Sequence, residues 1–381
     1  MAKITLVIWG IHNWIWPTAG RARYFAESIA EIYRDVQVIY VNPPIQHKLP
    51  LRHREFWLIW WKAWRMPIER YNGVTVLNVP PSPFPYSHHF FPFRLWRASL
   101  IGAKLQCHLD GDQQFLIVGD PKEWPLAYWW QRRGRTVVYD CADLMPAFQN
   151  AGERIVSEEA NLVRFASLVT CSAPGLVDHI KSLAPDKPVF LVRNGVHWER
   201  FQGNFPTPPN MSSISHPRIG FIGSISYWVD VELIARTAER RPEWNFLLIG
   251  PTRVPVPNLP NIHLLPPVPP EKVPYYLHNI DVGIIPFHDT PLTRCVNPVK
   301  LYEYLACGKP VVATPYGDFG DVEQWIYFAR TPEEFVKAIY NALREDCLDL
   351  QQQRRNAARH ASWRERSKEL LKAIQQVSAV D

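Results

Sequence analysis

The sequence has few cysteines, no closely spaced cysteine pair and no long apolar run. Its six cysteines lie at irregular intervals without a CxxC pair, a pattern typical of reduced thiols rather than of disulfides or structural zinc. The apolar run at residues 56–61 ends at Lys62, well short of the ~18 residues of a membrane-spanning helix. The first ten residues lack a signal-peptide cleavage site. We therefore expect a cytoplasmic protein without a membrane span.

Metal-binding patterns are also missing from the sequence. It contains no HExxH motif and no cluster of histidines and carboxylates with the spacing of metal ligands. We therefore expect no required metal and no cofactor.

The chain has 381 residues, of which 47% are hydrophobic and 20% are charged, and this composition excludes a disordered protein. Its length suggests about two domains. Residues 1–150 hold the whole net charge of +6 and most of the 16 tryptophans. This asymmetry is consistent with a soluble basic face, or with an anionic membrane, an anionic substrate or nucleic acid as partner.

Short aliphatic runs alternate with helix-like stretches along the chain, which is the pattern of a parallel α/β sheet. Residues 4–10, 21–33 and 36–42 predict the first strand–helix–strand unit. A second series begins after the polar stretch 203–217, with runs at 218–224, 245–250, 281–287 and 309–314. Two Rossmann-like halves therefore fit the sequence better than one large sheet.

Two segments, 51–71 and 87–105, mix bulky aromatics with Arg and Lys. They could be core helices with a basic edge, or amphipathic helices that lie on an anionic membrane surface. Nucleic-acid binding is a third reading, but no known nucleic-acid-binding signature accompanies these residues.

Ligands of open parallel sheets bind beyond the carboxyl ends of the strands. The turn at Gly220–Gly223–Ser224 follows a predicted strand and could approach a phosphate closely. Farther along, Glu303 lies on a predicted helix near otherwise apolar positions, and Lys300 precedes it by about one turn. Glu303 could accept hydrogen bonds from a ribose diol or be a surface charge, while Lys300 could meet a phosphate or pair with Glu303.

The stretch 298–312, PVKLYEYLACGKPVV, resembles the donor-site signature of GT-B glycosyltransferases, in particular the retaining group called family 4. The Gly220–Gly223 turn, the segment Asn194–Gly195–Val196 and the run VYDCAD at 138–143 add to the resemblance. Two departures accompany it. Cys295 stands where the first Glu of the family's E-x7-E motif belongs, and SISYWVD follows Gly223 in place of a basic pair.

The resemblance implies an α/β protein of the GT-B class, with two Rossmann-like domains that face each other across a cleft. We expect an acceptor domain at 1–203, a nucleotide-sugar domain at 204–362 and a C-terminal helix at 363–381 that packs back on the first domain. The implied donor is a nucleotide-diphosphate sugar, most often of UDP or GDP, and the implied mechanism is retaining and metal-independent. The expected donor-binding residues are Glu303, Lys300, Gly223, Ser224, Arg253, Arg294 and Pro298.

In the first half, Asp140 and Asp143 end a predicted strand and are candidates for catalysis, together with His12 from the first loop. Asp140 could equally cap the segment that follows it. Arg21 and Asn13 are candidates for acceptor binding. These residues predict a carboxylate that acts as a base or supports a sugar cation.

The preferred hypothesis is a glycosyltransferase of envelope or exopolysaccharide synthesis, peripheral on the inner face of the membrane, with a lipid-linked or glycan acceptor. Alternatives are a nucleotide-sugar 2-epimerase of the same double-Rossmann fold and a non-catalytic sugar-binding relative. We expect no nucleic-acid partner.

Overall fold

The structure is a computed structural model that describes residues 3–14, 20–43, 68–79 and 91–378. The chain divides into two compact units. The first comprises residues 1–192 and 367–381, and the second comprises residues 193–366. The chain therefore passes between the units twice, at Val192–Arg193 and at Arg366–Ser367.

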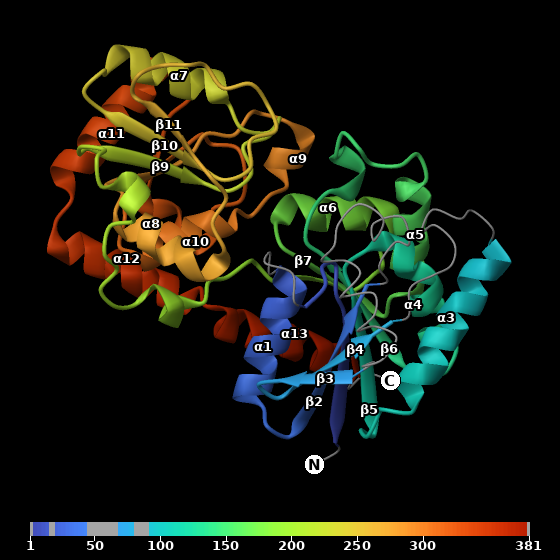
Figure 1. Ribbon diagram of the computed structural model, residues 1–381. Helices are drawn as coiled ribbons and strands as arrows, with labels where there is room; N and C mark the ends of the chain where they lie inside the picture. Colours follow the sequence, from blue (N-terminus) through green and yellow to red (C-terminus); the bar gives the residue numbers. More distant parts are fainter. Residues whose placement is uncertain (1–2, 15–19, 44–67, 80–90, 379–381) are drawn as a thin grey trace, which may run out of the picture. The chain divides into compact units, whose positions relative to one another are not determined.

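The first unit is built on an eight-stranded sheet of order β3-β4-β2-β1-β5-β6-β7-β8, in which only β3 is antiparallel to its neighbour (Figure 1). The strands are β1 (Ile4–Trp9), β2 (Val36–Asn42), β3 (Ile68–Tyr71), β4 (Val74–Asn78), β5 (Gln113–Val118), β6 (Thr136–Cys141), β7 (Leu168–Cys171) and β8 (Val189–Leu191). The central strands are buried along almost their whole length, because helices cover both faces of a parallel sheet.

Among the described residues, six helices cover this sheet. They are α1 (Arg21–Ile32), α3 (Phe91–Gln106), α4 (Trp124–Gln131), α5 (Ile155–Phe165), α6 (Pro174–Leu183) and α13 (Trp363–Ser378). Helices α1 and α13 lie on one side of the strands in Figure 1, and α3, α4 and α5 lie on the other. Residues of α13 from Lys368 onward line a cavity together with Ile4 of β1 and Phe115 of β5.

Strands β3 and β4 form a hairpin that corrects one hypothesis drawn from the sequence. The helix proposed over 51–71 is wrong for Ile68–Tyr71, which pair as a strand with β4. Asn72 and Gly73 turn the chain with φ of 43° and 87°, the left-handed pair that a two-residue hairpin requires. Residues 51–67 lie outside the described part of the chain.

The second unit is built on a parallel six-stranded sheet of order β11-β10-β9-β12-β13-β14. Its strands are β9 (Arg218–Ile222), β10 (Asn245–Ile249), β11 (Ile262–Leu265), β12 (Val282–Ile285), β13 (Val311–Ala313) and β14 (Ile326–Phe328). The helices are α7 (Val231–Arg240), α8 (Val273–His278), α9 (Pro291–Arg294), α10 (Val299–Ala306), α11 (Pro332–Glu345) and α12 (Leu348–His360). In Figure 1, α7 and α11 lie on one side of β9–β11, and α8, α10 and α12 lie on the other.

The strand order reverses between β9 and β12, and the two strands separate at this point. They pair only at Val282–Ile219 and Gly283–Gly220. Beyond that pair the Tyr304 hydroxyl of α10 accepts the backbone N–H of Ile222 at 3.1 Å. A Cβ on Gly283 would come within 2.6 Å of the Tyr304 ring. The reversal therefore lies at the carboxyl ends of β9 and β12, the place where ligands bind in doubly wound sheets.

No helix within the described residues is both long and apolar enough to cross a membrane.

Candidate functional site

The carboxyl edge of the second sheet begins with two glycine turns that touch each other. Gly223 follows β9 with φ 135°, and Gly250 follows β10 with φ 143°. A Cβ on Gly250 would lie 2.1 Å from the carbonyl oxygen of Gly223, so only glycine fits there. The N–H of Ile225 donates to Pro251 at 2.9 Å, and the N–H of Arg253 donates back to Ile225 at 2.8 Å. These hydrogen bonds hold the loop after β9 in place.

Ser224 carries a hydroxyl that lacks a partner. Its Oγ is buried, yet it has no hydrogen-bond partner among the described residues. A buried hydroxyl without a partner is costly. Ser224 directly follows Gly223 at the carboxyl edge of the sheet.

Lys300, in the first turn of α10, lies beside the same turn. Its Nζ is 5.2 Å from the ring centre of Phe221 and 5.1 Å from that of Phe287. A Cβ on Gly223 would lie 3.5 Å from its Cε. Burial lowers the pKa of Lys300 to about 8, an effect that the nearby Glu303 opposes. The ammonium has no ion pair among the described residues, so it is free to bind an anion.

Glu303 is half-buried and its carboxylate makes no hydrogen bond or ion pair among the described residues. Burial raises its pKa from 4.5 to about 7, while the charge of Lys300 acts in the opposite direction. Neighbouring titratable groups whose pKa values are shifted in opposite directions are frequent at functional sites.

The other residues expected to bind the nucleotide-sugar donor differ in their exposure and in their contacts. Pro298 precedes α10 as its N-cap residue. Arg253 is exposed and follows the Gly250 turn. Arg294 forms a two-pronged ion pair with Asp289, at 2.6 and 2.9 Å, on the surface. Its guanidinium is therefore already occupied. Cys295, in place of the family's first Glu, is the C-cap residue of the short helix α9.

An Asp–His contact at this edge has no counterpart in the sequence-based predictions. The Oδ2 of Asp230 lies 3.5 Å from Nδ1 of His288, while its Oδ1 accepts the N–H of Leu233 at the start of α7. The two residues meet because an antiparallel bridge joins Val229 to Phe287. The imidazole is 45% exposed and follows Phe287, whose ring contacts Lys300.

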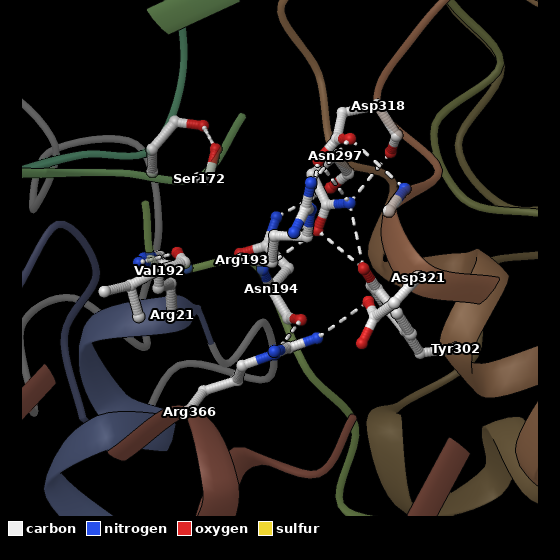
Figure 2. Close-up of polar contacts among 12 residues, drawn as sticks. Arg21, Ser172, Val192, Arg193, Asn194, Asn297, Tyr302, Asp318, Asp321 and Arg366 are labelled. Atoms are coloured by element: carbon white, nitrogen blue, oxygen red, sulfur yellow. Dashed lines mark hydrogen bonds and ion pairs between the residues drawn. The ribbon is translucent and has the colours of Figure 1, made fainter. Parts of the chain in front are cut away.

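Asn297 anchors the loop before α10 (Figure 2). Its amide donates to the Tyr302 hydroxyl at 2.9 Å and to the carbonyl of Asp318 at 2.8 Å, and its Oδ1 accepts the N–H of Asn194 at 2.9 Å. Two guanidinium nitrogens of Arg193 donate hydrogen bonds to the carboxylate of Asp318. Each polar group of the Asn297 side chain is thus used, although the residue is only 2% exposed.

In the first unit, Asp140 and Arg21 form a buried, two-pronged ion pair. The nearest contact is 2.8 Å, from Nε of Arg21 to Oδ2 of Asp140. Thr170 donates to the same carboxylate at 2.8 Å, and Arg21 also donates to the Val192 carbonyl at 2.7 Å. These bonds occupy both side chains, which is the arrangement of a pair that positions its neighbours.

Asp143 lies three residues beyond Asp140 and is half-buried. Its carboxylate makes no hydrogen bond among the described residues. Burial raises its pKa, the charge of Arg21 opposes this effect, and the charge of Asp140 adds to it. Asp143 is therefore the carboxylate of this edge that is available for chemistry.

A second carboxylate, Asp120, follows β5 at the same edge and was not singled out from the sequence. Burial and the charge of Glu123 raise its pKa to about 6. Its side chain also caps the following turn through the N–H of Lys122 at 3.0 Å. A Cβ on Gly119 would lie 3.4 Å from the carbonyl of Asp140, which places the two strand ends side by side.

His12 and Asn13 follow β1 at this edge. His12 is exposed, and its carbonyl accepts the Tyr40 hydroxyl at 2.7 Å. Asn13 is buried. Both come from the loop after β1, as the sequence predicts, and their neighbours at 15–19 lie outside the described residues.

Helix α3 presents a different face from the one its composition suggests. Arg94 pairs with Glu158 at 2.7 Å and Arg97 with Glu123 at 3.2 Å. The outer face instead carries Trp96, 56% exposed, and Leu100, 52% exposed. The arginines of this segment thus face acids of the same unit, and apolar side chains face outward.

Within the described residues, no group of three or more His, Cys, Asp or Glu is placed to hold a metal ion.

Comparisons with known proteins show what the chain is similar to. Residues 216–345 match the family described as glycosyl transferases group 1. The chain is 32% identical over 254 residues to TuaH of Bacillus subtilis, which is named as a teichuronic acid biosynthesis glycosyltransferase. That match covers 60% of this chain and 64% of TuaH, so the chain spans less than two thirds of its relative.

Solved structures match over nearly the whole chain. Sucrose-phosphate synthase from Thermosynechococcus elongatus has a TM-score of 0.69 at 13% identity and covers 100% of both chains. A trehalose-phosphate synthase from Burkholderia xenovorans has a TM-score of 0.70 at 12% identity, with 98% of this chain and 100% of that chain covered. HepE of Anabaena, in complex with UDP and glucose, has a TM-score of 0.64 at 16% identity and the same coverage. At these identities the likeness shows the fold, which is GT-B. The predicted fold class is confirmed, and the match of residues 216–345 to the group 1 family together with the similarity to TuaH agrees with the predicted resemblance to GT-B glycosyltransferases.

Proposed function

We propose that the protein transfers a sugar from a UDP- or GDP-sugar to a lipid-linked or polysaccharide acceptor in cell-envelope or exopolysaccharide synthesis. The observation that carries this proposal is the group formed by Ser224, Lys300 and Glu303. It joins a hydroxyl, an ammonium and a carboxylate, none with a partner among the described residues, near the carboxyl ends of β9 and β12.

Each group fits one part of a nucleotide sugar. The Glu303 carboxylate can accept two hydrogen bonds from the ribose 2′,3′-diol. The Lys300 ammonium can neutralise diphosphate charge, and its location above two aromatic rings leaves it few other partners. The Ser224 hydroxyl and the N–H groups at the start of α10 can donate to phosphate oxygens.

The comparisons support the substrate class. TuaH is named for teichuronic acid biosynthesis, HepE was solved with UDP and glucose, and an Escherichia coli trehalose-6-phosphate protein was solved with UDP-2-fluoro-glucose. We extend this chemistry to the present chain as part of the proposal.

In the reaction, the bond from the sugar C1 to the diphosphate breaks and a bond from C1 to the acceptor oxygen forms, while the acceptor hydroxyl loses its proton. Lys300 and the Ser224 hydroxyl stabilise the charge on the departing diphosphate. Asp143 supports the positively charged sugar or receives the proton, and the Arg21–Asp140 pair fixes the strand end that carries it. We propose retention at C1, as the family resemblance implies, with Lys300 supplying the positive charge in place of a metal.

The protein would act as a peripheral protein on the inner membrane face, where lipid-linked acceptors are presented. Support comes from the exposed Trp96 and Leu100 of α3, because aromatic and aliphatic side chains on one helix face insert at the headgroup boundary.

Calorimetric titration with UDP, GDP, TDP and ADP tests the donor assignment. We expect one of these to bind the wild-type protein and Glu303→Gln to weaken that binding. Glu239→Gln, an exposed acid near the end of α7, is the matched control and should bind like the wild type. Binding that is equal in both variants would remove Glu303 from the site. Turnover of the donor to its sugar epimer, without transfer, would favour an epimerase instead.

A further inference from the structure

Asn297 belongs to a set of side chains that joins the donor loop to the two places where the chain passes between the units. The donor loop is here residues 295–300, the segment that leads into α10. Asn297 sits in its middle, two residues before the first residue of α10.

The first junction is the segment that follows β8. The N–H of Asn194 donates to the Asn297 side chain at 2.9 Å, and the Asn194 amide donates to the Asn297 carbonyl at 2.7 Å. Asn194 thus forms hydrogen bonds with both the side chain and the backbone of Asn297. Nε of the preceding residue, Arg193, donates to Oδ2 of Asp318 at 2.7 Å. The N–H of Asp318 donates to the carbonyl of Val296 at 2.8 Å. Two independent connections therefore bind residues 193–194 to the donor loop.

The second junction is the segment that leads into the last helix. Nε of Arg366 donates to the Asn194 carbonyl at 3.2 Å (Figure 2). The N–H of Val196 donates to Ala361 at 3.1 Å, and the N–H of Trp363 donates to Val196 at 3.0 Å. A Cβ on Gly195 would lie 2.9 Å from the Ala361 carbonyl. The two junctions are therefore packed against each other at a distance that only glycine permits.

All these contacts lie within the second unit, and Asn194 connects both junctions to Asn297. The Asn297 amide also binds the hydroxyl of Tyr302, a residue one turn into α10. A shift of the donor loop by a bound nucleotide therefore cannot leave both junctions unchanged, because no hydrogen-bonding group of Asn297 is spare to absorb it.

We propose that Asn297 is a positioning residue that transmits nucleotide binding at the donor loop to the two segments, 193–197 and 361–366, through which the chain passes between its units. The inference rests on the proposed donor site. Asn297 lies between Cys295 and Glu303 in the sequence. The proposed role of Asn297 does not require that it contact the nucleotide.

Hydrogen–deuterium exchange of the full-length protein, with and without saturating UDP, tests the proposal; GDP replaces UDP if the calorimetric screen selects it. In the wild type, the nucleotide should slow exchange in peptides that cover 193–197 and 361–366. In Asn297→Ala, nucleotide affinity should stay within about threefold of the wild type, while the slowing at both segments disappears. Transfer kcat should then fall by roughly 2- to 30-fold, the range found for substitutions along coupling networks, with little change in donor KM.

Two further variants keep the test decisive. Tyr302→Phe removes the hydroxyl that accepts from Nδ2 of Asn297 and donates to its Oδ1, while the contacts of Asn297 with Asn194 and Asp318 remain. It should give a partial loss of slowing in a protein that folds normally. Asn245→Ala removes a comparable amide that binds Ser215 and His263 elsewhere in the unit, and it should behave like the wild type. Slowing that persists in Asn297→Ala, or a wild type that binds nucleotide without slowing at either segment, would overturn the inference alone. A wild type that binds no nucleoside diphosphate would overturn the proposed function as well.

Discussion

Replacement of Glu303 by Gln should change stability and nucleotide binding in opposite directions. The folded protein raises the pKa of Glu303 from 4.5 to about 7 because the side chain is buried. The folded state therefore holds this proton more tightly than the unfolded chain does. The wild type thus loses stability as pH rises from about 4.5 to about 7, and the full loss remains above that range.

The size of this effect follows from the pKa difference. A shift of this extent corresponds to at most ~3 kcal/mol, and residual solvent contact of the half-buried side chain reduces it to about 1–2 kcal/mol. Gln keeps the shape and removes the charge. At pH 8 we therefore expect Glu303→Gln to melt roughly 2–6 °C above the wild type, given the usual dependence of Tm on free energy for a unit of this size. At pH 4.5 the two proteins should melt together.

Binding should respond the other way. Loss of the charge-assisted hydrogen bonds to a ribose costs about 1.5–3 kcal/mol, which corresponds to roughly 10- to 100-fold in Kd. Scanning calorimetry at the two pH values and isothermal titration at pH 8 measure both quantities on the same samples. A variant that is destabilised at pH 8, or one that binds nucleotide as tightly as the wild type, would refute this account of Glu303.

Three other perturbations probe the remaining assignments. Asp143→Asn should lower kcat by about 10²–10⁴-fold with donor KM nearly unchanged, and a variant that merely loses stability while its folded fraction turns over normally would exclude a chemical role. Chelation by EDTA should leave transfer intact, and activity that returns only on addition of Mg²⁺ or Mn²⁺ would contradict the proposed use of Lys300. Trp96→Ser with Leu100→Ser should reduce sedimentation with anionic liposomes about tenfold or more, whereas the exposed-site control Ser99→Ala should not; equal sedimentation of both would remove α3 from the membrane surface.

Most of the two sheets could be predicted from the sequence because buried parallel strands are continuous apolar runs. Val36–Asn42 has the predicted bounds, and Arg21–Ile32 ends one residue before the predicted stretch 21–33 does. The hairpin of β3 and β4 was missed although Asn72–Gly73 is a strong turn signal, since the aromatic and basic composition of 51–71 favoured a helix. The junction between the units falls at Val192–Arg193, where no linker composition marks it.

The partners of the arginines in α3 could not be predicted from the sequence. Arg94 and Arg97 share a helix with exposed Trp96, and the sequence predicted a basic face or edge exposed to solvent or to an anionic membrane, separate from the aromatic face. The helical period separates them, and Glu158 and Glu123 come from segments distant in sequence. Only the fold shows that these arginines have acidic partners.

In the candidate donor site, too, some residues could be identified from the sequence and others only from the fold. Gly223, Lys300 and Glu303 could be singled out because a motif carries them in order, whereas Asp230 and His288 meet only through the bridge between Val229 and Phe287. This difference bears on the missing basic pair after Gly223. A diphosphate at the carboxyl ends of β9 and β12 would lie near one partly buried ammonium, that of Lys300. The exposed imidazole of His288, which contacts Asp230, is a further hydrogen-bonding group on the same edge. A site with so few fixed positive charges binds its anion through geometry more than through net charge, because hydroxyl and N–H donors act only at close range. The two glycine turns, which bring the backbone after β9 and β10 into contact, supply that close approach.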